Sequence, residues 1–319
     1  MTERVEATTD ASGPYEVVWL DNGRLRLGIV PLLGGRLLSL VHDGTELLWR
    51  NPALLDDRLH PAGGHRPAPA SGPMAAWANY GGDKTWPAPQ GWSSAQEWAG
   101  PPDPVLDSGP YTAAVREERD GATVTLESGH DPRTGLRLRR EIGLGAGRAS
   151  YDLRLTAVNE SSRPVRWALW NIAQYPGGGV VRVEVEAGAG APVELAVGTA
   201  APAWTRVGAG QRAGTELLEV PAQDVVGKLG FPGATGRLTY ARGRHRLTME
   251  WDVRADAAYP DGGSRAEVWM EHPLERPLEH LGGLNPPDRI VECEALGPWE
   301  RLEPGAAASL GVRVSVEAP

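Results

Sequence analysis

Short segments in which apolar and polar residues alternate recur along almost the whole chain, and this pattern constrains the fold more than any other feature. Turn signals separate the segments, and Asp43-Gly44, Asp120-Gly121 and Arg242-Gly243 are short enough for hairpins. Because period-two alternation is typical of strands and helical periodicity is hard to find, the pattern predicts an all-β sandwich or barrel of mostly antiparallel strands. Strands are expected at residues 24–30, 36–42, 111–118, 122–127, 136–142, 149–159, 164–173, 180–185, 237–242, 245–253, 266–270, 289–295 and 310–316.

Three segments depart from this alternation. Residues 1–14 are polar and acidic, and we expect a loose lead-in there, followed by a single domain over residues 15–319. Residues 51–110 are rich in Pro, Gly and Trp and are expected to form a long loop, which in a compact domain is usually functional or disordered. The tryptophans of that loop favour order, because disordered segments are poor in aromatic residues. The Ala- and Gly-rich residues 187–214 are expected to be an irregular excursion.

Charge and cysteine content exclude several classes of partner and site. The formal net charge of -9 argues against nucleic acids and anionic membranes, which require clustered positive charge. Cys293 is the only cysteine, so no internal disulfide can form, and His245 with Glu250 or His272 with His280 lacks a recognised metal-ligand spacing. No apolar run reaches the length of a membrane span, and we expect a cytoplasmic location. We also expect neither a metal nor a cofactor.

Lysine is rare in this chain. It occurs only at Lys84 and Lys228, whereas arginine supplies the other basic side chains. Lys84 is therefore a candidate for a position that needs a compact ammonium group, with chance under a compositional bias as the alternative.

Several segments together resemble a known superfamily. The opening segments are 22–30, 34–41 with its Gly-Gly-Arg turn, and 46–49; the closing segments are 291–298 and 302–305. Both sets resemble strands of aldose 1-epimerase-like proteins of the galactose mutarotase-like superfamily. The interior segment 81–90 looks like the signature of the DUF4380-type branch of that superfamily. The resemblance implies a galactose-mutarotase-like β-supersandwich.

The resemblance also implies a chemistry. In the epimerase family a carboxylate removes the proton of the anomeric hydroxyl, and usually a histidine protonates the ring oxygen. By its place in the closing-strand motif, Glu292 matches that base, and Glu294 faces the same side of the strand two residues later. Two neighbouring carboxylates can raise the pKa of one of them. The alternative is that one of the two lies at a solvated sheet edge.

The expected histidine is missing. The strand 165–174 resembles the family strand that delivers the acid, but it offers Asn171 and Gln174, which bind hydroxyl groups and cannot supply a proton. The acid must then come from elsewhere, with Lys84, His65 and His272 as candidates.

A second group of candidates faces these residues in the predicted site. Gly82 and Asp83 belong to an expected turn in which the carboxylate could accept two sugar hydroxyls, and Lys84 could bind an anionic substituent such as a phosphate or uronate. The alternative is a structural turn with an internal Asp–Lys pair.

Aromatic and basic residues complete the predicted site. Trp86, Trp92 and Trp170 are the tryptophans we favour for stacking on a sugar ring, although most tryptophans of the chain are expected in the core. Arg36 matches an arginine near the sugar site of related epimerases, and a hairpin corner is the alternative.

Three functions remain open at this stage. The first is a cofactor-free isomerase or epimerase that acts on a sugar or a glycosylated small molecule in a Trp-lined cleft, as a monomer or homodimer. The second is a non-catalytic carbohydrate-binding protein. The third is a lyase or cyclase of natural-product metabolism, because one fold can host several chemistries.

Overall fold

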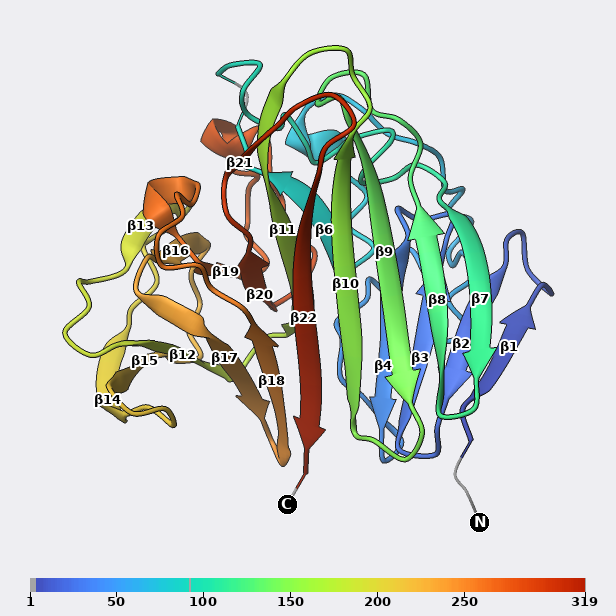
Figure 1. The fold of residues 1–319 in the computed structure, drawn as a ribbon, viewed down its shortest axis with the longest axis horizontal. Coiled ribbons are helices and arrows are strands. Elements are labelled where there is room, and N and C mark those ends of the chain that lie inside the picture. Colours follow the sequence, from blue (N-terminus) through green and yellow to red (C-terminus); the bar gives the residue numbers. More distant parts are fainter. Residues whose placement is uncertain (1–3, 92, 319) are drawn as a thin grey trace.

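The computed structural model describes residues 4–91 and 93–318, and nearly all of its regular structure is antiparallel β-sheet. Figure 1 shows two layers, with β22 and β10 of one sheet in front of β11 and β6 of the other. The first sheet has the order β1-β2-β3-β4-β6-β11-β20-β19-β16-β13, with β5 paired to β4 and β21 paired to β11. Its strands are β1 Glu6–Asp10, β2 Val17–Asp21, β3 Leu25–Val30, β4 Arg36–His42, β5 Thr45–Glu46, β6 Asp83–Ala88, β11 Val165–Pro176, β13 Val193–Val197, β16 Gly227–Phe231, β19 Ala266–Glu271, β20 Ile290–Leu296 and β21 Glu300–Leu302.

The second sheet has the order β14-β15-β12-β17-β18-β22-β10-β9-β8-β7. Short 3-10 turns, η1 Met74–Ala76, η2 Asp261–Gly263 and η3 Glu279–Leu281, are the helical elements of the described residues. None of them has the length and apolar character that a membrane span requires. The strands of this sheet are β7 Thr112–Glu118, β8 Gly121–Glu127, β9 Leu136–Gly145, β10 Ser150–Asn159, β12 Val180–Glu186, β14 Thr205–Ala209, β15 Thr215–Val220, β17 Ala234–Arg242, β18 His245–Trp251 and β22 Ala307–Glu317.

The predicted all-β class is confirmed, and each of the expected alternating segments forms a strand. The three segments expected to be irregular differ from the prediction. Residues 6–10 of the expected lead-in form the edge strand β1, and residues 187–214 contain β13 and β14. These edge strands are largely exposed, so they lack the alternation that marks a half-buried strand.

The long loop also contains a strand that the sequence pattern does not reveal. Residues 83–88 form β6, which lies between β4 and β11 in the first sheet and is buried at every position. Its sequence, Asp-Lys-Thr-Trp-Pro-Ala, has neither alternation nor the continuous apolar run of a strand buried on both faces, because Asp83 and Lys84 are buried in ion pairs. The residues expected to form a Gly-Gly-Asp-Lys turn are therefore the entry to a central strand.

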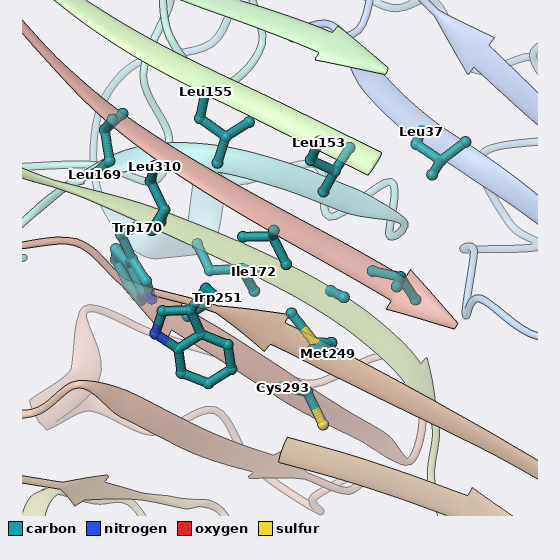
Figure 2. Close-up of a cluster of buried hydrophobic side chains, with 14 of the residues drawn as sticks. Leu37, Leu153, Leu155, Leu169, Trp170, Ile172, Met249, Trp251, Cys293 and Leu310 are labelled. Atoms are coloured by element: carbon teal, nitrogen blue, oxygen red, sulfur yellow. The ribbon is translucent and has the colours of Figure 1, made fainter. Parts of the chain in front are cut away.

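The hydrophobic core fills the space between the two sheets. Figure 2 shows Cys293 of β20 in one cluster with Met249 of β18, Leu153 of β10 and Leu310 of β22. Each buried aliphatic side chain of this kind contributes about 1.5–3 kcal/mol. Because Cys293 points into the core, its strand neighbours point to the opposite face of the first sheet.

One ion pair crosses this core. The guanidinium of Arg140 on β9 contacts the carboxylate of Asp83 on β6, and both side chains are fully buried. Arg140 Nη1 also donates to the carbonyls of Gly35 at 2.7 Å and Asp83 at 3.0 Å. Asn171 donates to the second Asp83 oxygen at 2.8 Å. Burial raises the pKa of Asp83, although the charge of Arg140 opposes this shift.

Candidate functional site

The outer face of the first sheet carries a cavity of about 280 Å³. Strand pairing sets its floor: Trp86 pairs with Trp170, and Gln174 pairs with Glu292, so these side chains share one face. The long loop, η2 and η3 supply the walls. The residues that line the cavity are Met74, Trp77, Trp86, Gln90, Pro101, Trp170, Leu195, Ala196, Lys228, Asp261, Trp269, Glu271, His280, Leu281, Gly282, Leu284 and Glu292.

Glu292 is held by two donors on one of its oxygens. Lys84 Nζ lies 3.0 Å and Gln174 Nε2 lies 2.6 Å from Glu292 Oε1. No hydrogen bond to Oε2 is formed within the described chain, which leaves this oxygen free to meet a ligand in the cavity that Glu292 lines. The Lys84 ammonium lies 4.8 Å from the ring centre of Trp86, and burial lowers the pKa of Lys84 while Glu292 opposes that shift.

A second buried lysine forms a matching group beside the first. Lys228 Nζ lies 2.9 Å from Glu294 Oε2 and 2.5 Å from Glu267 Oε2, and it lies 4.1 Å from the ring centre of Trp170. Trp170 Nε1 donates to Glu294 at 2.6 Å. Although burial opposes it, the neighbouring carboxylates raise the pKa of Lys228. Burial raises the pKa of Glu267 and of Glu294, and the charge of Lys228 opposes both shifts. The charge of Glu294 adds to the rise at Glu267, and the charge of Glu292 adds to the rise at Glu294.

Glu271 is another carboxyl side chain in the cleft. Trp269 Nε1 donates to its Oε1 at 2.7 Å, whereas Oε2 is buried without a hydrogen-bond partner. Burial, reinforced by the nearby charge of Glu292, raises the pKa of Glu271 to about 8. The group is therefore mostly protonated at neutral pH and can donate a proton.

Sequence reasoning missed part of this site. It singled out Lys84 but not Lys228, and it did not consider Glu267 or Glu271. Two signals were available. Lys228 is the only lysine besides Lys84, and the segment 266–271 places Glu267, Trp269 and Glu271 at alternate positions, as expected for one face of a strand.

The structure brings six of the predicted residues together on the cleft face. The two others from the same strands, Asp83 and Asn171, lie on the opposite face of the sheet and belong to the buried Arg140 network. Because neighbouring strand residues point in opposite directions, they are separated from the cavity by the sheet itself. The residues brought together are Lys84, Trp86, Trp170, Gln174, Glu292 and Glu294.

Arg36 and Gly82 do not line the cavity and have structural roles next to it. Arg36 is fully buried, pairs with Asp107 and donates to the Gly81 carbonyl at 3.3 Å. Asp107 also accepts from Trp77 Nε1 at 3.0 Å, so Arg36 supports a wall residue without lining the cavity. Gly82 has φ +76°, and an added Cβ would lie 2.3 Å from the Leu37 carbonyl oxygen, so this position requires glycine.

The predicted histidines do not join the cavity lining. His272 follows β19 and is absent from that lining, and His65 lies 2.9 Å from the Tyr80 hydroxyl. His280 is the histidine found there, with Nε2 3.0 Å from the Val197 carbonyl oxygen. Trp92 lies outside the described residues. Within residues 4–91 and 93–318, no group of three or more His, Cys, Asp or Glu side chains is placed to hold a metal ion.

Comparison with known proteins identifies a family. The model of the family described as "Domain of unknown function (DUF4380)" matches residues 16–310. No curated protein matches this sequence.

Solved structures of other proteins share the fold of this chain. A TPR-domain containing protein from Parabacteroides distasonis has a TM-score of 0.58 at 14% identity, covering 95% of this chain and 47% of that chain. A candidate mutarotase from Salmonella typhimurium has a TM-score of 0.57 at 14% identity, covering 100% and 95%. A galactose mutarotase-like protein from Lactobacillus casei has a TM-score of 0.55 at 13% identity, covering 94% and 100%. The predicted galactose-mutarotase-like fold is confirmed, and this chain spans about half of the first of these proteins.

Proposed function

This chain belongs to the DUF4380 family and has the galactose mutarotase-like fold, and from this premise we propose that its cleft binds a sugar and isomerises it by general acid–base catalysis. The observation that carries the proposal is the arrangement of Glu292. Its Oε1 is held by Lys84 and Gln174, and its Oε2 is free of hydrogen bonds from the described residues in a cavity with tryptophan walls.

Glu292 is the proposed base. The ammonium of Lys84 at 3.0 Å and the amide of Gln174 at 2.6 Å both donate to Oε1 and so fix the orientation of the carboxyl group. The free Oε2 takes the proton of the anomeric hydroxyl as that oxygen becomes a carbonyl oxygen. A positioned carboxylate of this kind contributes about 10²–10⁴-fold to the rate of such a proton transfer.

The cavity walls suit a polyhydroxylated ring. Trp77, Trp86 and Trp269 offer aromatic surface for the apolar face of a sugar, and Gln90 and Asp261 offer hydrogen-bonding groups for hydroxyls. The volume of about 280 Å³ lies near the lower end of ligand pockets, which run from about 300 to 1,000 Å³, and favours a ligand of one sugar ring. The mutarotase descriptions of the Salmonella and Lactobacillus proteins support a sugar-type ligand.

Anomeric equilibration measured by proton NMR tests this proposal. Wild type is added to freshly dissolved single anomers of a panel of aldoses, and ligand saturation transfer is recorded in the same samples. Wild type is expected to accelerate equilibration of at least one aldose, and Glu292→Gln to lose about 10²–10⁴-fold of that rate while it keeps saturation transfer. Glu303→Gln, which changes an exposed carboxylate, is the matched control and is expected to behave as wild type.

The outcomes separate the candidate functions. Saturation transfer without acceleration by wild type refutes the isomerase and leaves a carbohydrate-binding protein or an enzyme for another reaction. Equal acceleration by wild type and Glu292→Gln refutes the base assignment. Absence of both signals for every sugar refutes a sugar ligand.

A further inference from the structure

The proposed base lacks an evident acid partner. Ring opening requires a group that protonates the ring oxygen while Glu292 takes a proton from the anomeric hydroxyl. Lys84 is engaged by Glu292 at 3.0 Å, and Lys228 is held between two carboxylates. The histidine of the lining, His280, lies on the exposed η3 segment next to a backbone carbonyl.

We propose that Glu271 is the general acid of this site, an inference that rests on the proposed function. Glu271 is on β19 and Glu292 is on the adjacent strand β20. Trp269 pairs directly with Glu292, so Glu271 is the diagonal neighbour of Glu292 on the same face of the sheet. Diagonal neighbours of this kind lie about 7–8 Å apart, and both carboxyl groups line the same cavity. This spacing allows the two oxygens of a cyclic hemiacetal to lie between them.

The hydrogen bonds of Glu271 match a donor role. Its Oε1 accepts from Trp269 Nε1 at 2.7 Å, which fixes the orientation of the carboxyl group. Its Oε2 has no partner, although the side chain is only 5% exposed. A buried polar atom normally has a partner, so this oxygen is placed to exchange a proton with a ligand.

The charges around Glu271 keep it protonated. Burial and the charge of Glu292 on β20 raise its pKa to about 8, while Trp269 and Lys84 on β6 act in the opposite direction. Lys228 of β16 pairs with Trp269 on the side of β19 away from Glu292, and Asp261 of η2 and His280 of η3 line the same cavity. Glu271 also lines a second cavity of about 190 Å³, whose other described lining residues are amide, apolar or glycine residues without an ionisable side chain.

The proposed step is balanced in protons and electrons. Glu292 takes the hydroxyl proton, the O–H electron pair forms the carbonyl bond, and the bond between the anomeric carbon and the ring oxygen breaks. The released pair stays on the ring oxygen, which takes the proton of Glu271. Rotation of the aldehyde and the reverse proton transfers close the ring on the other face and restore both carboxyl groups. Two carboxyl groups with environments that separate their protonation states can perform both roles.

The pH dependence of kcat/KM for anomeric equilibration tests this inference. Because the acid must be protonated, the wild-type rate should fall as the pH rises through about 8. Glu271→Gln should lose about 10²–10⁴-fold in rate, with saturation transfer retained, and should lose this alkaline limb. Trp269→Phe removes a donor that lowers the pKa of Glu271, so its alkaline limb should move to higher pH. Glu303→Gln, at an exposed carboxylate outside the cavity, is the control and should keep the wild-type rate and alkaline limb. His280→Gln tests the alternative acid in the lining.

The outcomes distinguish the two proposals. Activity within about twofold of wild type in Glu271→Gln, with the alkaline limb unchanged, refutes the acid role and leaves the proposed function intact. A loss confined to His280→Gln assigns the acid to that histidine instead. Failure of wild type to accelerate any sugar refutes the proposed function and the acid role with it.

Discussion

The buried pair of Arg140 and Asp83 predicts a large and pH-dependent effect of a single substitution. Arg140→Met leaves the Asp83 carboxylate between the sheets with only Asn171 as a side-chain donor. Removing one partner of a buried pair destabilises a protein by about 3–5 kcal/mol. With a urea m value of about 3 kcal/mol/M, the unfolding midpoint should fall by roughly 1–1.7 M.

The sign of the pH dependence follows from the pKa of Asp83. Burial already raises this pKa in the wild type, and loss of the Arg140 charge raises it further. A carboxyl group whose pKa is higher in the folded state than in the unfolded state favours folding below the unfolded pKa. This contribution is lost as the pH rises through the folded pKa. The deficit of Arg140→Met should therefore be smaller at pH 5 than at pH 8.

Urea unfolding followed by tryptophan fluorescence at both pH values measures the effect. Arg139→Met is the matched control, because Arg139 is the next residue on β9 but is exposed and makes only surface pairs with Glu127 and Glu141. Such pairs contribute about 0–1 kcal/mol each. Equal midpoints for the two variants, or a deficit of Arg140→Met that does not depend on pH, would refute the reasoning.

Two further outcomes follow from backbone geometry and from cleft charge. Gly82→Ala should destabilise the protein by about 1–3 kcal/mol more than Gly23→Ala, as measured by thermal unfolding. Both glycines have a similar positive φ, +76° and +77°, but only an alanine Cβ at position 82 meets the Leu37 carbonyl oxygen. Equal losses would show that the close approach is relieved without strain. Phosphorylated sugars should bind at least tenfold more weakly than the neutral sugars, as measured by competition saturation transfer. The cleft holds more carboxyl groups than ammonium groups, and Lys84 and Lys228 are already paired with glutamates. Tighter binding of the phosphorylated form would support instead the sequence-based interpretation of Lys84 as a binder of anionic substituents.

The strand pattern was readable from the sequence because half-buried strands must alternate. The predicted segment 149–159 differs from β10 by one residue at one end, and the predicted segment 122–127 differs from β8 by one residue at one end. Both strands alternate between buried and more exposed positions. The strand β6 could not be predicted in this way, because it is buried at every position yet includes the ion-paired Asp83 and Lys84. Its sequence therefore shows neither alternation nor the continuous apolar run of a strand that is buried on both faces.

Part of the error in the predicted site was avoidable from the sequence. Asp83 and Lys84 are adjacent in the chain, as are Trp170 and Asn171, and adjacent residues of a strand face opposite sides of a sheet. The prediction nevertheless assigned all four to one cleft. Once β6 and β11 are known as strands, the period-two rule places Lys84 and Trp170 on the cleft face of the sheet and Asp83 and Asn171 on the core face.

The sequence by itself determined the all-β class, the positions of most strands and the family, because alternation, turns and motifs are local properties of the chain. The sequence also indicated Glu292 as a candidate base, and the scarcity of lysine indicated Lys84 as a candidate site residue. Only the tertiary structure decided which residues meet. Glu271 and Glu292 become neighbours through the pairing of β19 with β20, and Lys84 reaches Glu292 because β6 and β20 flank β11. Contacts of this kind depend on strand order and register, which arise from the packing of the whole sheet.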